Sequence, residues 1–184
     1  MQDRVIHMIL PKGGSGIKII ELAGWTGKVF LISRTNLKDI KNRPESSNPR
    51  VYFLFGESGE STKQQLYIGE SENFFDRLIN HDSNKGFWNF AVVFVGGLDK
   101  AKVRYIEWIA SQEAHKIGRF EIKNSVSRNE NTLSEYDEIT TKDFFENMKF
   151  ILNVLGFPIF ENVKESILDK NIYKLIGENF DAKA

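Results

Sequence analysis

The sequence predicts an α+β fold in which a small three-stranded antiparallel sheet is flanked by helices. Three short apolar runs, at residues 51–56, 66–69 and 90–95, have the composition of strands. Two longer segments, at residues 101–116 and 134–155, carry apolar residues at helical spacing. We also expect an amino-terminal β-hairpin and a long carboxy-terminal helix. A chain of 184 residues, 41% of them hydrophobic, is long enough to bury such a core without disulfides or metal ions.

The first 48 residues are predicted to form a hairpin and linker ahead of the core. Residues 17–21 and 28–33 are typical of two strands joined by the turn at 24–27. The glycine-rich stretch 11–16 lacks the spacing of a Walker loop, so we interpret it as a connecting loop. Thr35 can cap a short helix at residues 36–42, and the Pro-, Ser- and Asn-rich stretch 44–49 leads into the core.

The predicted core covers residues 49–125. A polar loop at residues 57–65 separates its first two strands, which predicts a hairpin with a long connection. Ser71 is a suitable N-cap for a helix over residues 72–82. The third strand and the helix at 101–116 follow, and Gly118 is suited to end that helix.

A helical extension is predicted for residues 126–160, followed by a tail of mixed character at residues 161–184. Thr132 and Glu135 have the spacing of a capping box at the start of the long helix. Gly156 and Pro158 are expected to end this helix.

Composition excludes several classes of site. The absence of cysteine excludes disulfides and thiolate zinc sites, and it favours a reducing compartment, here the cytoplasm. No apolar run approaches the roughly 20 residues that cross a bilayer, so no membrane partner is expected. Net charge is zero, but residues 1–50 hold nine Lys or Arg against four Asp or Glu, and residues 125–184 hold seven against eleven. The basic half could contact a polyanion, or both could be ordinary solvated surface.

Four polar side chains follow one another through the hairpin and the next helix. Tyr52 and Tyr67 lie on the two strands, and Arg77 and His81, four residues apart, share one flank of the helix at 72–82. Each also has an ordinary structural explanation, as core-edge tyrosines with satisfied hydroxyls, a surface arginine and a partly exposed histidine.

Glu107 is the sharpest signal because it falls within the apolar pattern of the helix at 101–116. A carboxylate directed at an apolar face is costly unless it is paired or bound to a cation. Two alternatives remain open, an ion pair with Arg104 and a position at the wet edge of the stripe. Two phenols, a guanidinium, an imidazole and a lone carboxylate together suit phosphodiester hydrolysis assisted by one divalent metal ion.

The order of these residues resembles the signature of the GIY-YIG nuclease family. Arg-Val-Tyr at residues 50–52 stands where the first motif belongs, and Tyr-Ile-Gly at 67–69 matches the second in full. Arg77 follows Tyr67 by ten residues and His81 follows by four more, as in the family. Glu107 takes the place of the family's metal ligand, and Asn124 is the match to its late Asn.

The resemblance covers roughly residues 20–160. Stretches at 24–28, 87–89, 133–135 and 154–157 are similar to a bacterial and phage subgroup, in which a small domain of unknown function often follows the nuclease domain. Residues 180–183 resemble the opening of that domain, so we expect a further carboxy-terminal domain beyond this chain.

The resemblance implies a metal-dependent endonuclease that hydrolyses phosphodiester bonds in DNA, with RNA not excluded. It implies that Glu107 binds one Mg²⁺ or Mn²⁺ and that Tyr67, or His81 acting through it, takes a proton from the attacking water. It also implies that Arg77 neutralises charge on the phosphate. The implied catalytic residues are Tyr52, Tyr67, Arg77, His81, Glu107 and Asn124, and the implied substrate contacts are Arg77, Arg50, Gly69 and Ser71.

Three residues depart from the family pattern. Arg50 replaces the Gly of the first motif, Val51 replaces its Ile, and Glu70 stands where several members carry Lys. The carboxylate of Glu70 adds negative charge near the expected metal and removes a phosphate contact. Together with the zero net charge, it supports the alternative that the chain is a catalytically weak or inactive module that binds nucleic acid or protein.

Overall fold

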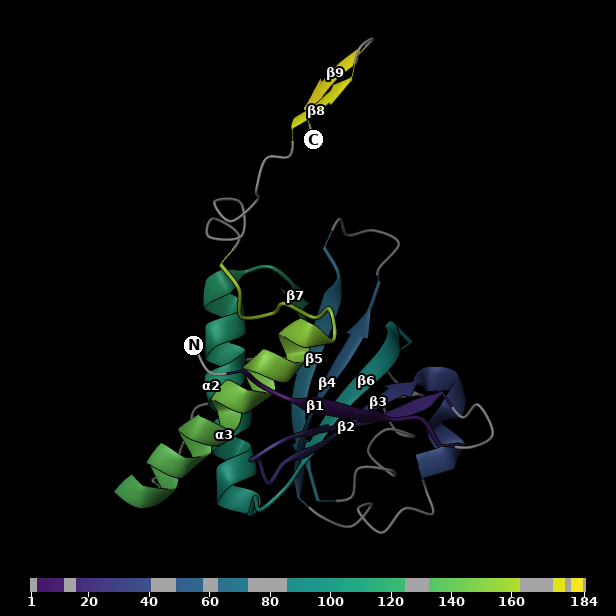
Figure 1. Cartoon of the computed structure of the whole chain (residues 1–184). Helices are drawn as coiled ribbons and strands as arrows, with labels where there is room; N and C mark the ends of the chain where they lie inside the picture. The colour runs from purple at the N-terminus through teal and green to yellow at the C-terminus, as the bar shows by residue number, and fades with distance from the viewer. Residues whose placement is uncertain are drawn as a thin grey trace.

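In the part of the chain that the structure describes, seven strands form one mixed sheet in the order β1-β2-β3-β6-β4-β5-β7 (Figure 1). The computed structural model describes residues 3–11, 16–40, 49–57, 63–72, 86–124, 133–162, 174–177 and 180–183. The strands are β1 (Ile6–Ile9), β2 (Ile17–Leu22), β3 (Lys28–Ser33), β4 (Arg50–Gly56), β5 (Gln65–Ser71), β6 (Trp88–Val95) and β7 (Glu121–Ile122). The predicted α+β class is confirmed.

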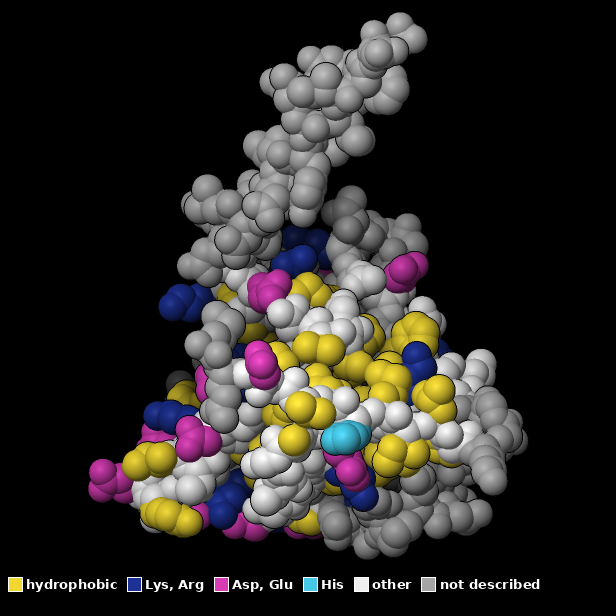
Figure 2. All heavy atoms as spheres, viewed as in Figure 1, with side chains coloured by type: hydrophobic (Ala, Val, Ile, Leu, Met, Phe, Trp, Pro, Cys, Tyr) yellow, Lys and Arg dark blue, Asp and Glu magenta, His cyan; other side chains and the backbone are white. Residues whose placement is uncertain are grey.

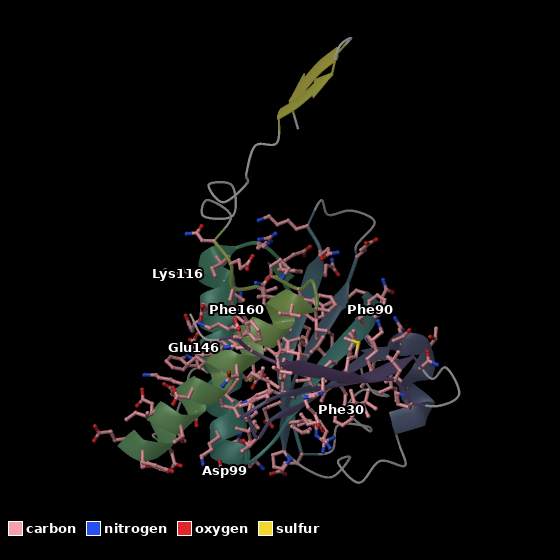
Figure 3. The ribbon with its side chains drawn as sticks, in the orientation of Figure 1. Phe30, Phe90, Asp99, Lys116, Glu146 and Phe160 are labelled. Carbon is pink, nitrogen blue, oxygen red and sulfur yellow. The ribbon has the colours of Figure 1, made fainter. Side chains whose placement is uncertain are left out.

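Helix α2 (Lys100–Ile117) follows β6, helix α3 (Glu135–Val154) follows β7, and a 3₁₀ helix, η1 (Arg34–Ile40), follows β3. The side chain of Asp99 accepts a hydrogen bond from the Lys102 amide at 2.9 Å and begins α2. Gly118, with a φ of 66°, ends α2 in the left-handed region, as the sequence predicted. Asp99 and Lys116 mark the two ends of this helix in Figure 3.

The prediction of a small three-stranded sheet was wrong. The three expected strands are present, because β4 pairs antiparallel with both β5 and β6. However, β3 also pairs with β6, from Lys28↔Val95 to Ser33↔Phe90, so the amino-terminal hairpin extends the same sheet. The physical reason is that β3 is apolar on both faces: Val29, Phe30 and Ile32 are all at most 2% exposed, as in an interior strand.

Several local details also differ from the prediction. The short helix lies at residues 34–40 as a 3₁₀ helix, and β1 and β7 were not predicted. At the start of α3 the capping residue is Ser134, whose hydroxyl accepts a hydrogen bond from the Asp137 amide at 3.1 Å. Thr132, the capping residue that the sequence predicted, lies outside the described residues. Most of the helix expected at 72–82, with Arg77 and His81, lies outside the described residues.

The sheet has a buried core on each face. On the face that we call the helix face, α2 and α3 cover a cluster that includes Phe53, Ile68 and Phe94. The opposite face, which we call the tyrosine face, buries Tyr52, Tyr67, Trp88, Phe30 and Leu37 of η1. Figure 1 shows α2 and α3 on one side of the sheet and η1 on the other. Because successive strand residues point to opposite faces, β4 and β5 each contribute to both cores.

The end of the chain forms a separate antiparallel hairpin of β8 (Lys174–Gly177) and β9 (Phe180–Lys183). Within the described ranges, neither α2 nor α3 is apolar enough over its length to cross a lipid bilayer.

Candidate active site

Two tyrosines stack on neighbouring strands of the tyrosine face. In the pairing of β4 with β5, Tyr52 lies opposite Gly69 and Leu54 lies opposite Tyr67. The two phenol rings are therefore diagonal neighbours, with centroids 6.1 Å apart and planes inclined by 30°. Tyr52 is fully buried, whereas Tyr67 retains 9% of its exposure. The structure thus brings together the two phenols that the sequence singled out.

Gly69 allows the Tyr52 ring to lie across β5. A Cβ atom at this position would stand 2.5 Å from the hydroxyl oxygen of Tyr52 and 2.9 Å from Cε1 of Tyr67. No side chain fits in that space without moving one of the rings. Gly69 was predicted as a substrate contact, and its position gives it a steric role in setting the Tyr52 hydroxyl.

Arg50 and Ser71 extend the tyrosine row toward the end of the sheet. They lie opposite each other at the ends of β4 and β5, and both share the face of Tyr52 because they are two residues from Tyr52 and Gly69. Arg50 is 2% exposed and Ser71 9% exposed. A guanidinium at this depth is costly unless anions or hydrogen-bond acceptors face it, and Tyr52 is the phenol two positions along the same face of β4.

Asn124 joins the Tyr67 strand to helix α2. Its side-chain oxygen accepts a hydrogen bond from the Ile68 amide at 3.2 Å, and its side-chain nitrogen donates to the Ser111 hydroxyl at 3.4 Å. Ser111 lies on α2 and is 2% exposed. β7 pairs in parallel with β5 at Gln65 and Leu66. Asn124 lies two residues after the end of β7, so it continues along the same edge of β5. The amide group fixes the spacing between strand and helix.

Glu107 lies on the side of α2 that faces β5. Three residues before it, the Nε atom of Arg104 lies 3.7 Å from a carboxylate oxygen of Glu70 on β5. Four residues after it, Ser111 contacts Asn124 and through it the Ile68 amide. Residues spaced by three and four lie on one side of a helix, so the half-buried Glu107 occupies the turn between these contacts.

Glu107 and Tyr67 approach β5 from opposite faces. Helix α2 packs on the helix face, where Ile106 and Ala110 join Ile68 in one core, whereas Tyr67 belongs to the core of the tyrosine face. Between them lies the stretch of β5 that follows its pairing with β7. The sequence did not indicate this division between faces.

Ser111 was missed by the sequence analysis. Its position four residues after Glu107 and eight after Val103, on the apolar side of the helix, is a signal that could have found it. The sequence left open an ion pair between Arg104 and Glu107. In the structure, the carboxylate that lies next to Arg104 is that of Glu70.

Arg77 and His81 lie outside the described residues, and their roles stay predictions.

The first two turns of α2 carry three cations that face carboxylates. Lys100 lies 3.4 Å from Glu72, Arg104 lies 3.7 Å from Glu70, and Lys102 lies 2.9 Å from Asp137 of α3. The hydrogen bond to Asp137 raises the pKa of Lys102 and outweighs the opposing effect of burial. The pairs with Glu70 and Glu72 bring opposite charges together at the end of β5, whereas the pair with Asp137 joins α2 to α3.

Glu107 is the residue that the sequence predicted as a metal ligand, and the side chains around it bear on that prediction. Among the described residues, no three His, Asp or Glu side chains lie close enough to form a metal cage. Mg²⁺ is commonly held by one or two carboxylates, with waters and substrate phosphates filling its other positions. Glu107 is a half-buried carboxylate, so the metal site that the sequence predicts there stays a prediction.

A pocket of about 260 Å³ lies at the other end of β4 and is lined by Phe55, Gly56 and Phe90, among others. Phe90, labelled in Figure 3, is 46% exposed there. Since Arg50 and Tyr52 lie near the start of β4, this apolar pocket is separate from the tyrosine row.

Comparisons of the chain with known protein families, with curated proteins and with solved structures find no match.

Proposed function

We propose that the chain is a metal-dependent endonuclease of the GIY-YIG type that hydrolyses phosphodiester bonds in DNA. The observation that carries the proposal is the arrangement around β5. Two stacked phenols, Tyr52 and Tyr67, lie on one face of paired strands beside the buried Arg50. At the outer edge of β5, Asn124 ties the same strand to the helix that bears Glu107.

The phenols would handle the proton in the reaction. In the proposal, Tyr67, which retains some exposure, accepts a proton from the attacking water, either itself or with His81 acting through it. A phenol must lose its own proton before its oxygen can accept another, so Tyr67 would pass its hydroxyl proton to His81 or would act as the phenolate. Tyr52, which is fully buried and held by Gly69, would act by positioning the neighbouring Tyr67 ring.

Cationic side chains would hold the phosphate. Arg77, predicted to lie on the helix that follows β5, has the planar fork that suits two phosphate oxygens. Arg50, which is 2% exposed on the tyrosine face, would add positive charge behind the site. Ser71, opposite Arg50, would add a hydroxyl donor. These contacts strengthen as charge develops on the phosphoryl oxygens, which lowers the barrier.

Glu107 would hold the divalent ion, Mg²⁺ or Mn²⁺, and Asn124 would keep the helix and strand at the spacing that this requires. When bound, the ion supplies Lewis-acid stabilisation of the scissile phosphate and of the leaving 3′ oxygen.

A plasmid-nicking assay with Mg²⁺ or Mn²⁺ tests the proposal. The native chain should convert supercoiled plasmid to the nicked form, and Glu107→Ala should reduce the rate by at least about 10²-fold. Glu113→Ala on the same helix is a matched control, because Glu113 pairs with Lys149 of α3 away from β5. Parallel assays with labelled RNA would define the substrate class. Nicking that survives Glu107→Ala would remove the assigned metal role.

The second candidate is an inactive or weakly active module that binds nucleic acid or protein. The pairing of Arg104 with Glu70 favours it, because a carboxylate occupies a position where a free cation would attract phosphate. Binding of a labelled duplex, followed by fluorescence anisotropy, without nicking in either metal would support this alternative. In that case, Glu107→Ala should leave binding unchanged.

A further inference from the structure

β1 is an edge strand with apolar side chains exposed on both of its faces. In the described part of the chain it pairs only with β2 and is the last strand of the sheet. Val5, Met8, Ile9 and Leu10 are 47 to 66% exposed, and Figure 2 shows hydrophobic side chains gathered on this face of the molecule. Residues 5–10 contain no Lys, Arg, Asp or Glu, the charges that commonly protect such an edge.

The register shows which backbone groups point outward. The Ala23 amide donates to the carbonyl oxygen of Val5 at 2.9 Å, which continues the pairing in which His7 lies opposite Glu21. In an antiparallel ladder, every second residue exchanges its hydrogen bonds with the neighbouring strand. Val5, His7 and Ile9 therefore turn their backbone groups toward β2, and Ile6 and Met8 turn theirs away from the sheet.

We propose that this edge pairs with the same edge of a second copy of the chain. The two β1 strands run antiparallel about a two-fold axis at His7, so that Ile6 lies opposite the partner's Met8. The outward backbone groups of Ile6 and Met8 then meet their counterparts in both directions. The sheet continues from one protomer into the other.

The pattern of β1 suits a second copy because it is symmetric about His7. On one face, Ile6 meets the partner's Met8, and on the other, Val5 meets the partner's Ile9, so apolar side chains meet on both faces. His7 alone lies opposite itself. A strand that is apolar on both faces is typical of a sheet interior, and this pairing places β1 there. The zero net charge of the chain adds no long-range repulsion between the copies.

Single-cysteine variants test the pairing directly, because the chain has no cysteine of its own. In the proposed pair, the two copies of residue 7 have Cα atoms about 4.5 Å apart, within the range for a disulfide. Residue 8 faces the partner's residue 6 rather than its own copy, so the Cα atoms of the two copies of residue 8 are about 7 Å or more apart. Under mild oxidation, His7→Cys should form a covalent dimer at least about tenfold faster than Met8→Cys. Equal rates, or faster linkage at residue 8, would overturn the proposal.

Sedimentation of the native chain provides an independent measurement. We expect a species of twice the 21.2 kDa chain mass at high protein concentration. Met8→Lys should shift this species to the monomer without changing the circular dichroism spectrum, because the side chain is half exposed and Lys protects an edge. A native chain that stays monomeric, or a dimer unaffected by Met8→Lys, would contradict the pairing.

Discussion

Replacing Gly69 by alanine tests whether this residue sets the position of the Tyr52 hydroxyl. The new Cβ would lie 2.5 Å from the hydroxyl oxygen and 2.6 Å from Cζ of Tyr52. An ordinary contact of this kind is longer by about 1 Å, so the ring must shift by a comparable distance. Tyr52 is fully buried between β4, β5 and the tyrosine-face core, so there is no free space to receive it.

The expected cost follows from overpacking. Inserting a methyl group into a well-packed core costs about 1 to 3 kcal/mol. For a domain of this size, that corresponds to a fall in Tm of roughly 2 to 12 °C. If Tyr52 acts in catalysis, a displacement of about 1 Å should also reduce the nicking rate by about 10²-fold.

Thermal unfolding and plasmid nicking should be measured on Gly69→Ala and on Gly97→Ala. A Cβ at Gly97 meets no atom within 4 Å, so this control should change neither quantity. The double variant Gly69→Ala/Tyr52→Phe removes the oxygen that makes the shortest contact, and it should recover part of the Tm and none of the activity. A Gly69→Ala protein with the Tm and nicking rate of Gly97→Ala would refute this reasoning.

Three further measurements probe the contacts around the site and helix α3. Asn124→Ala leaves the Ile68 amide without its acceptor and should lower the free energy of unfolding in urea by about 1 to 3 kcal/mol, while Asn124→Asp keeps the acceptor and should lose less. Hydrogen bonds from Lys102 and then Ser134 hold the pKa of Asp137 below its usual value, so this stabilisation is present above the unfolded-state pKa and is lost as pH falls through the folded one. At pH values below about 4, the urea concentration at the unfolding midpoint should therefore decrease, and it should decrease less steeply in Asp137→Asn. Burial and the hydrogen bond to Glu138 raise the pKa of Tyr105, so ultraviolet titration should show a late-ionising tyrosine that Tyr105→Phe removes.

Elements with strong local periodicity could be predicted from the sequence. The spacing of Val103, Ile106 and Ala110 identified α2, and the structure buries all three. Gly118 identified its end, because a residue in the left-handed region favours glycine. The hairpin of β4 and β5 was also predicted, since two apolar runs flank a polar loop.

Long-range pairing could not be predicted in the same way. The attachment of β3 to β6 joins residues about sixty positions apart, and no local pattern in either strand names its neighbour. β1 has apolar residues on both faces without alternation, so periodicity gives no signal there. The sequence placed Tyr67 and Glu107 in one site, but only the pairing and packing of β5 show that they approach this strand from opposite faces.

This division constrains where a phosphate could be bound if the proposed function is correct. β5 is paired on its outer side with β7 only at Gln65 and Leu66, and farther along it borders Asn124 and α2. A phosphate that contacts Tyr67 from one face and an ion on Glu107 from the other must therefore sit at the edge of β5, near Gly69 and Glu70. The Arg104–Glu70 pair lies at that same place, so Glu70→Lys should strengthen duplex binding more than Glu72→Lys does. Fluorescence anisotropy at low and high salt would measure the difference, and equal effects of the two substitutions would place the phosphate elsewhere.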